Sequence, residues 1–284
     1  MNLRRFGLHA STAGGLDNAA HEAIEAGANC LQIFSSSPRM WRASALDHAR
    51  VRAFRTLREK HDLHPLAIHC NYLINLASAD PGVLRLSLES FRGELARAVA
   101  IGADFLVVHP GSIKGHESKE AALQLAAASV GAAATGIEPK GLRLLIENTA
   151  GSGQAIGSTF EDLSTLAALI RKVTDFPLGF CIDTCHCYAA GYDVATQLDL
   201  VLRGLDAAVG LDHVHLIHAN DSKGELGSHL DRHANIGEGK IGEAGFRGIV
   251  NHSGLATKAF VLETPMEDGL GVRDLATLRR LVAA

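Results

Sequence analysis

Short apolar segments alternate with longer amphipathic segments along the whole chain. Eight of the short segments have the near-continuous apolar character of strands that are buried on both faces of a parallel sheet. We predict strands in "RRFGLHAS", "NCLQIFSSS", "PLAIHCN", "DFLVVHPGS", "LRLLIENTA", "LGFCIDTC", "HVHLIHAND" and "KAFVLETP".

Most of the predicted strands are separated by alanine- and leucine-rich segments with helical spacing. Examples are residues 15–28, 84–103 and 159–173. Asp17, Ser87 and Thr159 stand where N-caps are expected, and Gly27 and Gly102 stand near the predicted helix ends.

The regular alternation, without a linker rich in proline or serine, predicts one α/β domain over residues 1–284. Eight strand–helix units in this length fit a (β/α)8 TIM barrel, which typically takes about 250 residues. The alternative is a doubly wound open sheet, which usually has a glycine-rich phosphate loop after its first strand. The segment "HASTAGG" is a weak approximation to such a loop, so we favour the barrel.

Ionisable side chains stand where the predicted strands end. In a barrel these ends open on one face, where active sites lie. Burying so many ionisable groups together is too costly unless cations or networks compensate them. Imidazoles and carboxylates without four clustered thiolates favour a catalytic Zn²⁺ or Mn²⁺ site. The residues are His9, His69, His109, Glu147, Asp183, His218 and Glu263.

A second group of candidate ligands follows the seventh predicted strand. Asp231 and His233 are two residues apart, so their side chains point the same way in an extended loop and can share a metal ion. His186 could complete this site. The alternative is an ordinary solvated loop with a turn at "IGEG".

The segment "CIDTCHCYAAG" (181–191) allows two interpretations. Cys181, Cys185, Cys187 and His186 could form a structural zinc site, or Asp183 and His186 could be the ligands. Cys181 lies inside a predicted strand, and the chain has no second cysteine pair to complete a thiolate site. We therefore favour the second interpretation.

Composition limits the partners and the cellular compartment that we expect for this protein. The net charge of −4 argues against nucleic-acid binding by bulk electrostatics, so such a partner needs a local patch or metal ions. We find no signal peptide and no apolar run of membrane-spanning length. We therefore expect a cytoplasmic protein with free or metal-bound thiols that does not enter membranes.

Six segments together resemble the endonuclease IV family of apurinic/apyrimidinic endonucleases. They are "HCNYLINLAS", "VVHPGS", "LIENTAGSG", "GFCIDTCHCYAAGYD", "NDSKGELGSHLDRHANIGEG" and "LETP". The resemblance implies a TIM barrel with a trinuclear zinc centre, with Mn²⁺ an alternative in one or more sites. It also implies a DNA-repair enzyme that hydrolyses the phosphodiester 5′ to an abasic site in duplex DNA. The products would carry a 3′-hydroxyl and a 5′-deoxyribose phosphate.

The resemblance also implies the ligands of each zinc ion and a monomeric enzyme. His69, His109 and Glu147 would hold the first ion. Glu147 would bridge to the second, completed by Asp183, His218 and Glu263, so that Glu147 and Glu263 are the expected catalytic carboxylates. His186, Asp231 and His233 would hold the third.

Arg39, Trp41 and Tyr72 follow the second and third predicted strands. They resemble the residues with which the family enters the duplex where the abasic nucleotide is flipped out. For Trp41 the alternative is ordinary loop packing.

Two other functions remain open from the sequence. A sugar isomerase or epimerase similar to xylose isomerase would need a single metal ion and only Glu147, Asp183, His218 and Glu263. A non-catalytic metal- or DNA-binding module is the second. The remaining histidines and Asp231 favour the nuclease, since a one-metal isomerase has no use for them.

Overall fold

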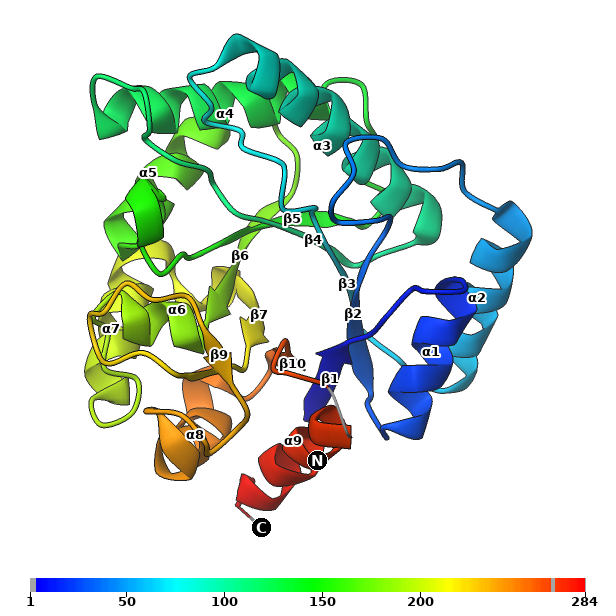
Figure 1. Cartoon of the computed structure of the whole chain (residues 1–284), viewed down its shortest axis with the longest axis vertical. Helices are drawn as coiled ribbons and strands as arrows, with labels where there is room; N and C mark the ends of the chain where they lie inside the picture. The colour runs from blue at the N-terminus through cyan, green and yellow to red at the C-terminus, as the bar shows by residue number, and fades with distance from the viewer. Residues whose placement is uncertain (1–3, 267–268, 284) are drawn as a thin grey trace.

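Parallel strands close into a barrel in the computed structural model, which describes residues 4–266 and 269–283. Around the barrel the strands follow the order β1, β2, β3, β4, β5, β6, β7 and β10, and β10 pairs back with β1 (Figure 1). Their bounds are Arg5–His9, Cys30–Phe34, Leu66–His69, Phe105–Val108, Arg143–Glu147, Leu178–Asp183, Val214–His218 and Ala259–Leu262. The barrel prediction is confirmed, and the open doubly wound sheet is excluded.

Helices surround the barrel on its outside (Figure 1). They are α1 (Leu16–Glu25), α2 (His48–Lys60), α3 (Pro81–Ile101), α4 (Lys119–Ala134), α5 (Phe160–Ile170), α6 (Thr184–Ala189), α7 (Leu198–Val209), α8 (Gly242–Asn251) and α9 (Leu270–Leu281). Short 3₁₀ turns lie at Ser152–Gln154, Leu211–His213 and Ser253–Leu255. An antiparallel pair, β8 (Asp221–Ser222) and β9 (His233–Ala234), lies after β7. No helix among the described residues has the length and apolar character needed to cross a bilayer.

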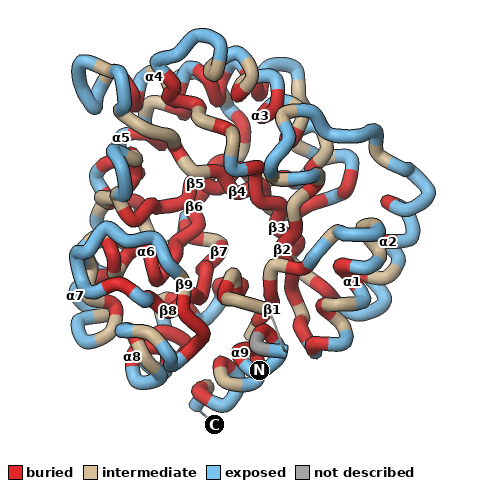
Figure 2. Tube along the Cα trace, in the orientation of Figure 1, coloured by how far each residue is buried: buried red, intermediate tan, exposed pale blue. Residues whose placement is uncertain are grey.

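The apolar core has two layers. Figure 2 shows the strands of the barrel as mostly buried. The larger layer fills the space between strands and helices. The smaller layer fills the barrel interior and is built from small and medium side chains: Cys30, Ala67, Val107, Leu145, Cys181, Leu216, Ala259 and Val261. Gly7 permits the close pairing of β1 and β2, because a Cβ at this position would lie 2.1 Å from the Cys30 carbonyl oxygen.

Of the three N-caps predicted from the sequence, the structure confirms one. Thr159 is the N-cap of α5, as predicted, and its hydroxyl accepts the Asp162 N–H. The prediction was wrong for Asp17, which lies in the first turn of α1 after Gly15. It was also wrong for Ser87, which is buried within α3. That helix begins earlier, at Pro81, with Asp80 as its N-cap, because proline is well tolerated in the first helical turn.

Candidate metal centre

The ionisable residues at the strand ends converge on the carboxyl-terminal mouth of the barrel. His9, His69, Glu147, Asp183 and His218 are the last residues of β1, β3, β5, β6 and β7. His109 and Glu263 directly follow β4 and β10. The closed barrel therefore brings together side chains from seven of its strands.

Glu147 connects two groups of side chains through its two oxygens. Its Oε2 lies 3.0 Å from His69 Nε2 and 3.4 Å from His109 Nε2. Its Oε1 lies 2.8 Å from His218 Nδ1. Glu147 is buried, and it stands between the first and second expected metal sites.

The second group is completed by Asp183 and Glu263. The ligand atoms of Glu147, Asp183, His218 and Glu263 all lie within 4.8 Å of one another. Glu263 Oε2 is 3.1 Å from His218 Nδ1. The Asn220 amide joins the two carboxylates, since its Nδ2 donates to Asp183 Oδ2 at 2.6 Å and to Glu263 Oε2 at 3.3 Å.

The third group forms where the loop before β9 folds back over α6. Asp231 Oδ1 lies 3.3 Å from His186 Nε2 and 3.4 Å from His233 Nε2. Asp183 Oδ2 lies 3.7 Å from His233 Nε2, and Asp183 Oδ1 caps α6 by accepting the His186 N–H at 2.8 Å. Asp183 therefore belongs to the second and third groups together, whereas the family resemblance implied a place in the second alone.

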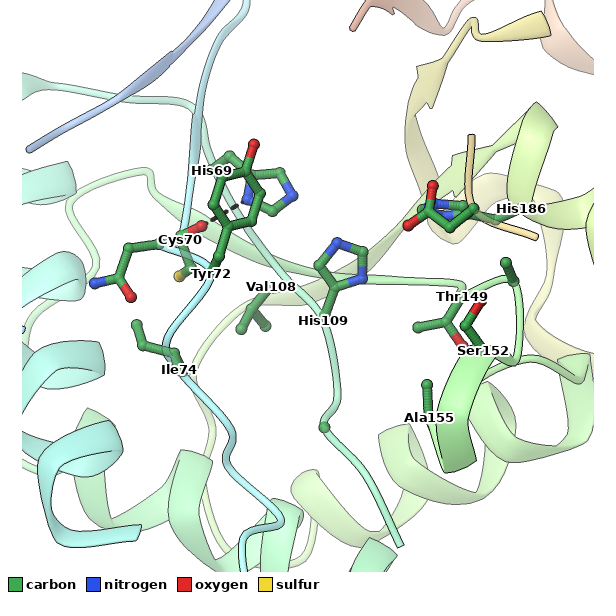
Figure 3. Close-up of a pocket in the computed structure, with 14 residues that line it drawn as sticks. His69, Cys70, Tyr72, Ile74, Val108, His109, Thr149, Ser152, Ala155 and His186 are labelled. Atoms are coloured by element: carbon green, nitrogen blue, oxygen red, sulfur yellow. Dashed lines mark hydrogen bonds and ion pairs between the residues drawn. The ribbon is translucent and has the colours of Figure 1, made fainter. Parts of the chain in front are cut away.

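Backbone carbonyl groups fix the orientation of two of these histidines. His69 Nδ1 lies 2.7 Å from the Cys70 oxygen, and His186 Nδ1 lies 2.9 Å from the Asn148 oxygen. Because a carbonyl oxygen only accepts, each Nδ1 carries the proton, and each Nε2 faces the carboxylates. Figure 3 shows His109 between His69 and His186 in the same pocket.

The electrostatics of the chain without metal ions favour charged forms within the cluster. Burial opposes charge on Glu147, but the charges of His218 and His109 and the hydrogen bonds from His218 and His69 hold its pKa well below the usual value. Burial also opposes charge on His186, but Asp183 and then Asp231 raise its pKa to about 10. His109 differs, because burial lowers its pKa. Imidazolium protons thus occupy positions that cations could take.

The cysteine interpretation is not supported by the positions of the thiols. Among the described residues, no candidate metal group unites Cys185 or Cys187 with His186. Cys181 Sγ does lie with Glu147 and His218 in a group whose ligand atoms are within 4.8 Å of one another. Burial raises the pKa of this thiol to about 12, and the side chain packs in the apolar barrel interior, so we assign Cys181 to the core.

The donor set fits hard or borderline divalent cations. Each group presents imidazole nitrogens and carboxylate oxygens, which are the ligand atoms of catalytic Zn²⁺ and Mn²⁺ sites. His233 Nε2 supports this fit, because it is buried without a hydrogen-bond partner in the described part of the chain although two carboxylates face it. A cation between these groups would satisfy all of them.

Three buried amides that sequence reasoning missed hold the candidate ligands. Asn148 Oδ1 accepts the Asp183 N–H at 2.7 Å, and Asn220 Oδ1 accepts the Glu263 N–H at 2.8 Å. Gln32, inside β2, contacts Glu263 and His218. The sequence held a signal for each of them. Asn148 directly follows Glu147, Asn220 lies two residues after His218, and Gln32 is the one polar residue within "CLQIF".

A cavity of about 610 Å³ opens above the cluster. His9, Phe34, Tyr72, His186, Arg232 and Glu263 are among the residues that line it. Tyr72 is 69% exposed, and its ring packs on Phe34 with a centroid distance of 5.2 Å.

The loop after β2 carries the other two residues expected to contact DNA. Arg39 is exposed. Trp41 is half-buried and lines a separate cavity against α3 with Glu89, Gly93 and Arg97. The Tyr72 N–H donates to the Pro38 oxygen at 3.3 Å, so the two loops contact each other.

Sequence comparison finds a family model and related proteins that match nearly the whole chain. A family model described as a xylose isomerase-like TIM barrel matches residues 20–281. A probable endonuclease 4 from Solibacter usitatus is 48% identical over 99% of this chain and 97% of its own length. Endonuclease 4 from Thermus thermophilus is 43% identical over 96% of this chain and 97% of its own.

Solved structures agree in fold. The crystal structure of endonuclease IV from Thermus thermophilus superposes with a TM-score of 0.86 at 41% identity, covering 98% of both chains. A D-tagatose 3-epimerase-like protein has a TM-score of 0.71 at 20% identity, covering 98% of this chain and 96% of its own, and at this identity it shows the barrel alone.

Proposed function

The chain belongs to the endonuclease IV family, and from this membership we propose that it is a zinc-dependent nuclease that cuts duplex DNA at abasic sites. It would hydrolyse the phosphodiester on the 5′ side of the lesion, leaving a 3′-hydroxyl and a 5′-deoxyribose phosphate. The observation that carries this proposal is Glu147, whose Oε2 faces His69 and His109 while its Oε1 faces His218 in the neighbouring group. This is the arrangement of a carboxylate that bridges two metal ions.

Three groups of residues would hold three zinc ions. The first is His69, His109 and Glu147, and the second is Glu147, Asp183, His218 and Glu263. The third is His186, Asp231 and His233, with Asp183 beside it. Such ions, when bound, neutralise a phosphodiester and supply a water-derived nucleophile at neutral pH.

The side chains of the cluster are oriented before substrate arrives. The Cys70 and Asn148 carbonyl groups direct Nε2 of His69 and His186 into the mouth, and Asn220 holds Asp183 and Glu263 in place. Burial of Glu147 excludes water from beneath the reacting groups. Preorganised charges in such an environment stabilise a transition state more strongly than charges in water do.

The charge balance supports a phosphate substrate on a weakly acidic protein. Glu147, Asp183, Asp231 and Glu263 contribute four negative charges, and three divalent ions would contribute six positive charges. The loaded mouth would therefore be cationic although the chain carries a net charge of −4. All nine candidate ligands also come from one chain, which supports a monomer as the active unit.

Tyr72 is the residue best placed to enter the duplex, because it is exposed at the rim of the cavity. Arg39 is exposed on the neighbouring loop. The half-buried position of Trp41 against α3 favours the loop-packing alternative, in which Trp41 supports that loop from below.

A sugar isomerase or epimerase remains the alternative, since the barrel is shared with such proteins at the level of fold. Its single metal ion would use Glu147, Asp183, His218 and Glu263. It leaves five residues without a role: His69, His109, His186, Asp231 and His233. Asp231 Oδ1 nevertheless lies 3.3 Å from His186 Nε2 and 3.4 Å from His233 Nε2.

The test is incision of a duplex that carries one tetrahydrofuran abasic analogue. We expect cleavage on the 5′ side of the analogue, complete loss of cleavage with chelator, and recovery when zinc is added back. Cleavage that persists in chelator would contradict the zinc requirement. Conversion of a ketose, with no incision by the metal-replete protein, would favour the isomerase.

A further inference from the structure

Gln32 is an uncharged side chain at the centre of the charged mouth. It lies on β2 and is fully buried. Its Nε2 donates to Glu263 Oε1 at 2.6 Å and lies 3.0 Å from His9 Nδ1. Its Oε1 lies 2.8 Å from His218 Nε2. One amide thus contacts a carboxylate and two imidazoles.

We propose that Gln32 is a positioning residue that fixes His218 with its proton on Nε2 and Nδ1 toward the second metal site, while it holds Glu263 in place. The inference rests on the proposed function, because it assigns the atom through which His218 would bind its ion. It adds a residue outside the nine candidate ligands.

The carboxylate of Glu263 determines which way the amide points. An ionised carboxylate only accepts hydrogen bonds, so the group 2.6 Å from Glu263 Oε1 has to be a donor. A reversed amide would place two oxygen acceptors against each other at that distance. The amino group therefore faces Glu263, and the carbonyl group faces His218.

The orientation of Gln32 in turn determines the tautomer of His218. Since Gln32 Oε1 accepts, His218 Nε2 carries the hydrogen. Nδ1 is then the ring atom that lies 2.8 Å from Glu147 Oε1 and 3.1 Å from Glu263 Oε2, in the space shared by the second group. A partner that fixes the tautomer of a ligating histidine is a general feature of metal sites.

The same amino group accounts for the different role of His9. His9 Nδ1 accepts from Gln32 Nε2, so its hydrogen is on Nε2. Its one lone pair is thereby occupied. Its Nε2 is buried without a hydrogen-bond partner in the described part of the chain, and His9 belongs to none of the candidate metal groups found there, although it ends a strand at the mouth.

His218 is also the histidine whose orientation a substitution can test. Backbone carbonyl groups orient His69 and His186, and no side-chain replacement removes a backbone carbonyl. For His218 the same task falls to the side chain of Gln32. Gln32→Met keeps much of the volume and removes both hydrogen-bonding groups.

The experiment measures zinc affinity and the His218 tautomer in the absence of DNA. Zinc affinity is measured by competition with a chromophoric chelator, and the tautomer by long-range ¹H–¹⁵N NMR, with His218 assigned from the signal lost in His218→Gln. We expect a hydrogen on Nε2 in the wild type, with and without zinc. We expect Gln32→Met to bind zinc about 10–100-fold more weakly at one site. Gln124→Met, the same change on the exposed surface of α4, should leave both readouts unchanged.

A zinc-loaded wild type with its His218 hydrogen on Nδ1 would overturn the inference even if Gln32→Met failed to fold. So would a folded Gln32→Met protein with wild-type zinc affinity and tautomer. If both expected results were obtained and abasic DNA were still not cut, the proposed function would fail and the role of Gln32 would stand. A wild-type chain that takes up no zinc would overturn both.

Discussion

Replacing Glu147 by glutamine tests the bridging role of this carboxylate with almost no change in shape. The native side chain presents one oxygen to His69 and His109 and the other to His218. An amide has a single acceptor oxygen, so in Glu147→Gln one of the two groups would face an NH₂ donor. The substitution also removes one of the four carboxylate charges that would balance part of the six positive charges of three zinc ions.

The expected size of the effect follows from these contacts. Loss of an outer partner of a metal ligand typically costs about 10–100-fold in metal affinity. Glu147 would contact two ions directly, so we expect a loss above about 100-fold at each, or about 2.7 kcal/mol per site. In the third group only His186 lies near Glu147, with 3.6 Å between its Nδ1 and Glu147 Oε1. The Asn148 carbonyl oxygen accepts from this Nδ1, and Nε2 faces Asp231, so the third group should keep its ion.

The assay is zinc content after dialysis against a weak chelator, combined with the incision rate. We expect Glu147→Gln to retain about one zinc ion of three and to lose roughly 10³-fold or more in incision. Asp231→Asn is the matched control, because it removes a carboxylate of the third group and should cost one ion rather than two. Full zinc content and a wild-type rate in Glu147→Gln would refute the bridging assignment.

Three further predictions concern DNA contact, protonation and stability. Tyr72→Ala should weaken selectivity for abasic over intact duplex while leaving zinc content unchanged, because Tyr72 is exposed beside the cluster. If the wild type and Tyr72→Ala show the same selectivity in competition binding, Tyr72 does not have this role. Without metal, His186 has its pKa raised from 6.5 to about 10, so its stabilising contribution is complete below about pH 6.5 and is lost as the pH rises towards 10. Zinc has to displace this proton, so calorimetry should detect proton release when zinc binds at pH 7, and zinc affinity should rise with pH. Zinc uptake without proton release would contradict the assignment of His186 as a zinc ligand. Arg58→Ala should lower the free energy of unfolding in urea by about 2 kcal/mol, because the buried guanidinium donates to the Leu63 and Gly102 carbonyl oxygens and pairs with the partly exposed Asp104. The exposed control Arg85→Ala should cost about 0.3–0.5 kcal/mol, and equal losses would show that burial of Arg58 has little effect.

The strands and the ends of the strands could be predicted because both depend on local pattern. Buried parallel strands need continuous apolar residues, and a polar residue at the end of such a run has only the mouth of the barrel to face. The same rule located His69, Glu147 and Glu263 without knowledge of which strands are neighbours.

The features that were missed depend on contacts between residues that lie far apart in the sequence. Gln32 appears in the sequence as one polar residue within a strand, and its partners Glu263 and His218 lie 231 and 186 positions away. The second contact of Asp183, with His233, depends on how the loop before β9 folds. Short helix signals failed for a related reason at Ser87, where a long helix continued through a plausible cap.

Anomalous diffraction at the zinc absorption edge, from crystals of the zinc-loaded chain, distinguishes three ions at the mouth of the barrel from one. We expect three peaks at the carboxyl-terminal mouth, with Glu147 between the first two and His218 bound through Nδ1. A single peak among Glu147, Asp183, His218 and Glu263, or a peak bound by cysteine thiolates, would contradict it.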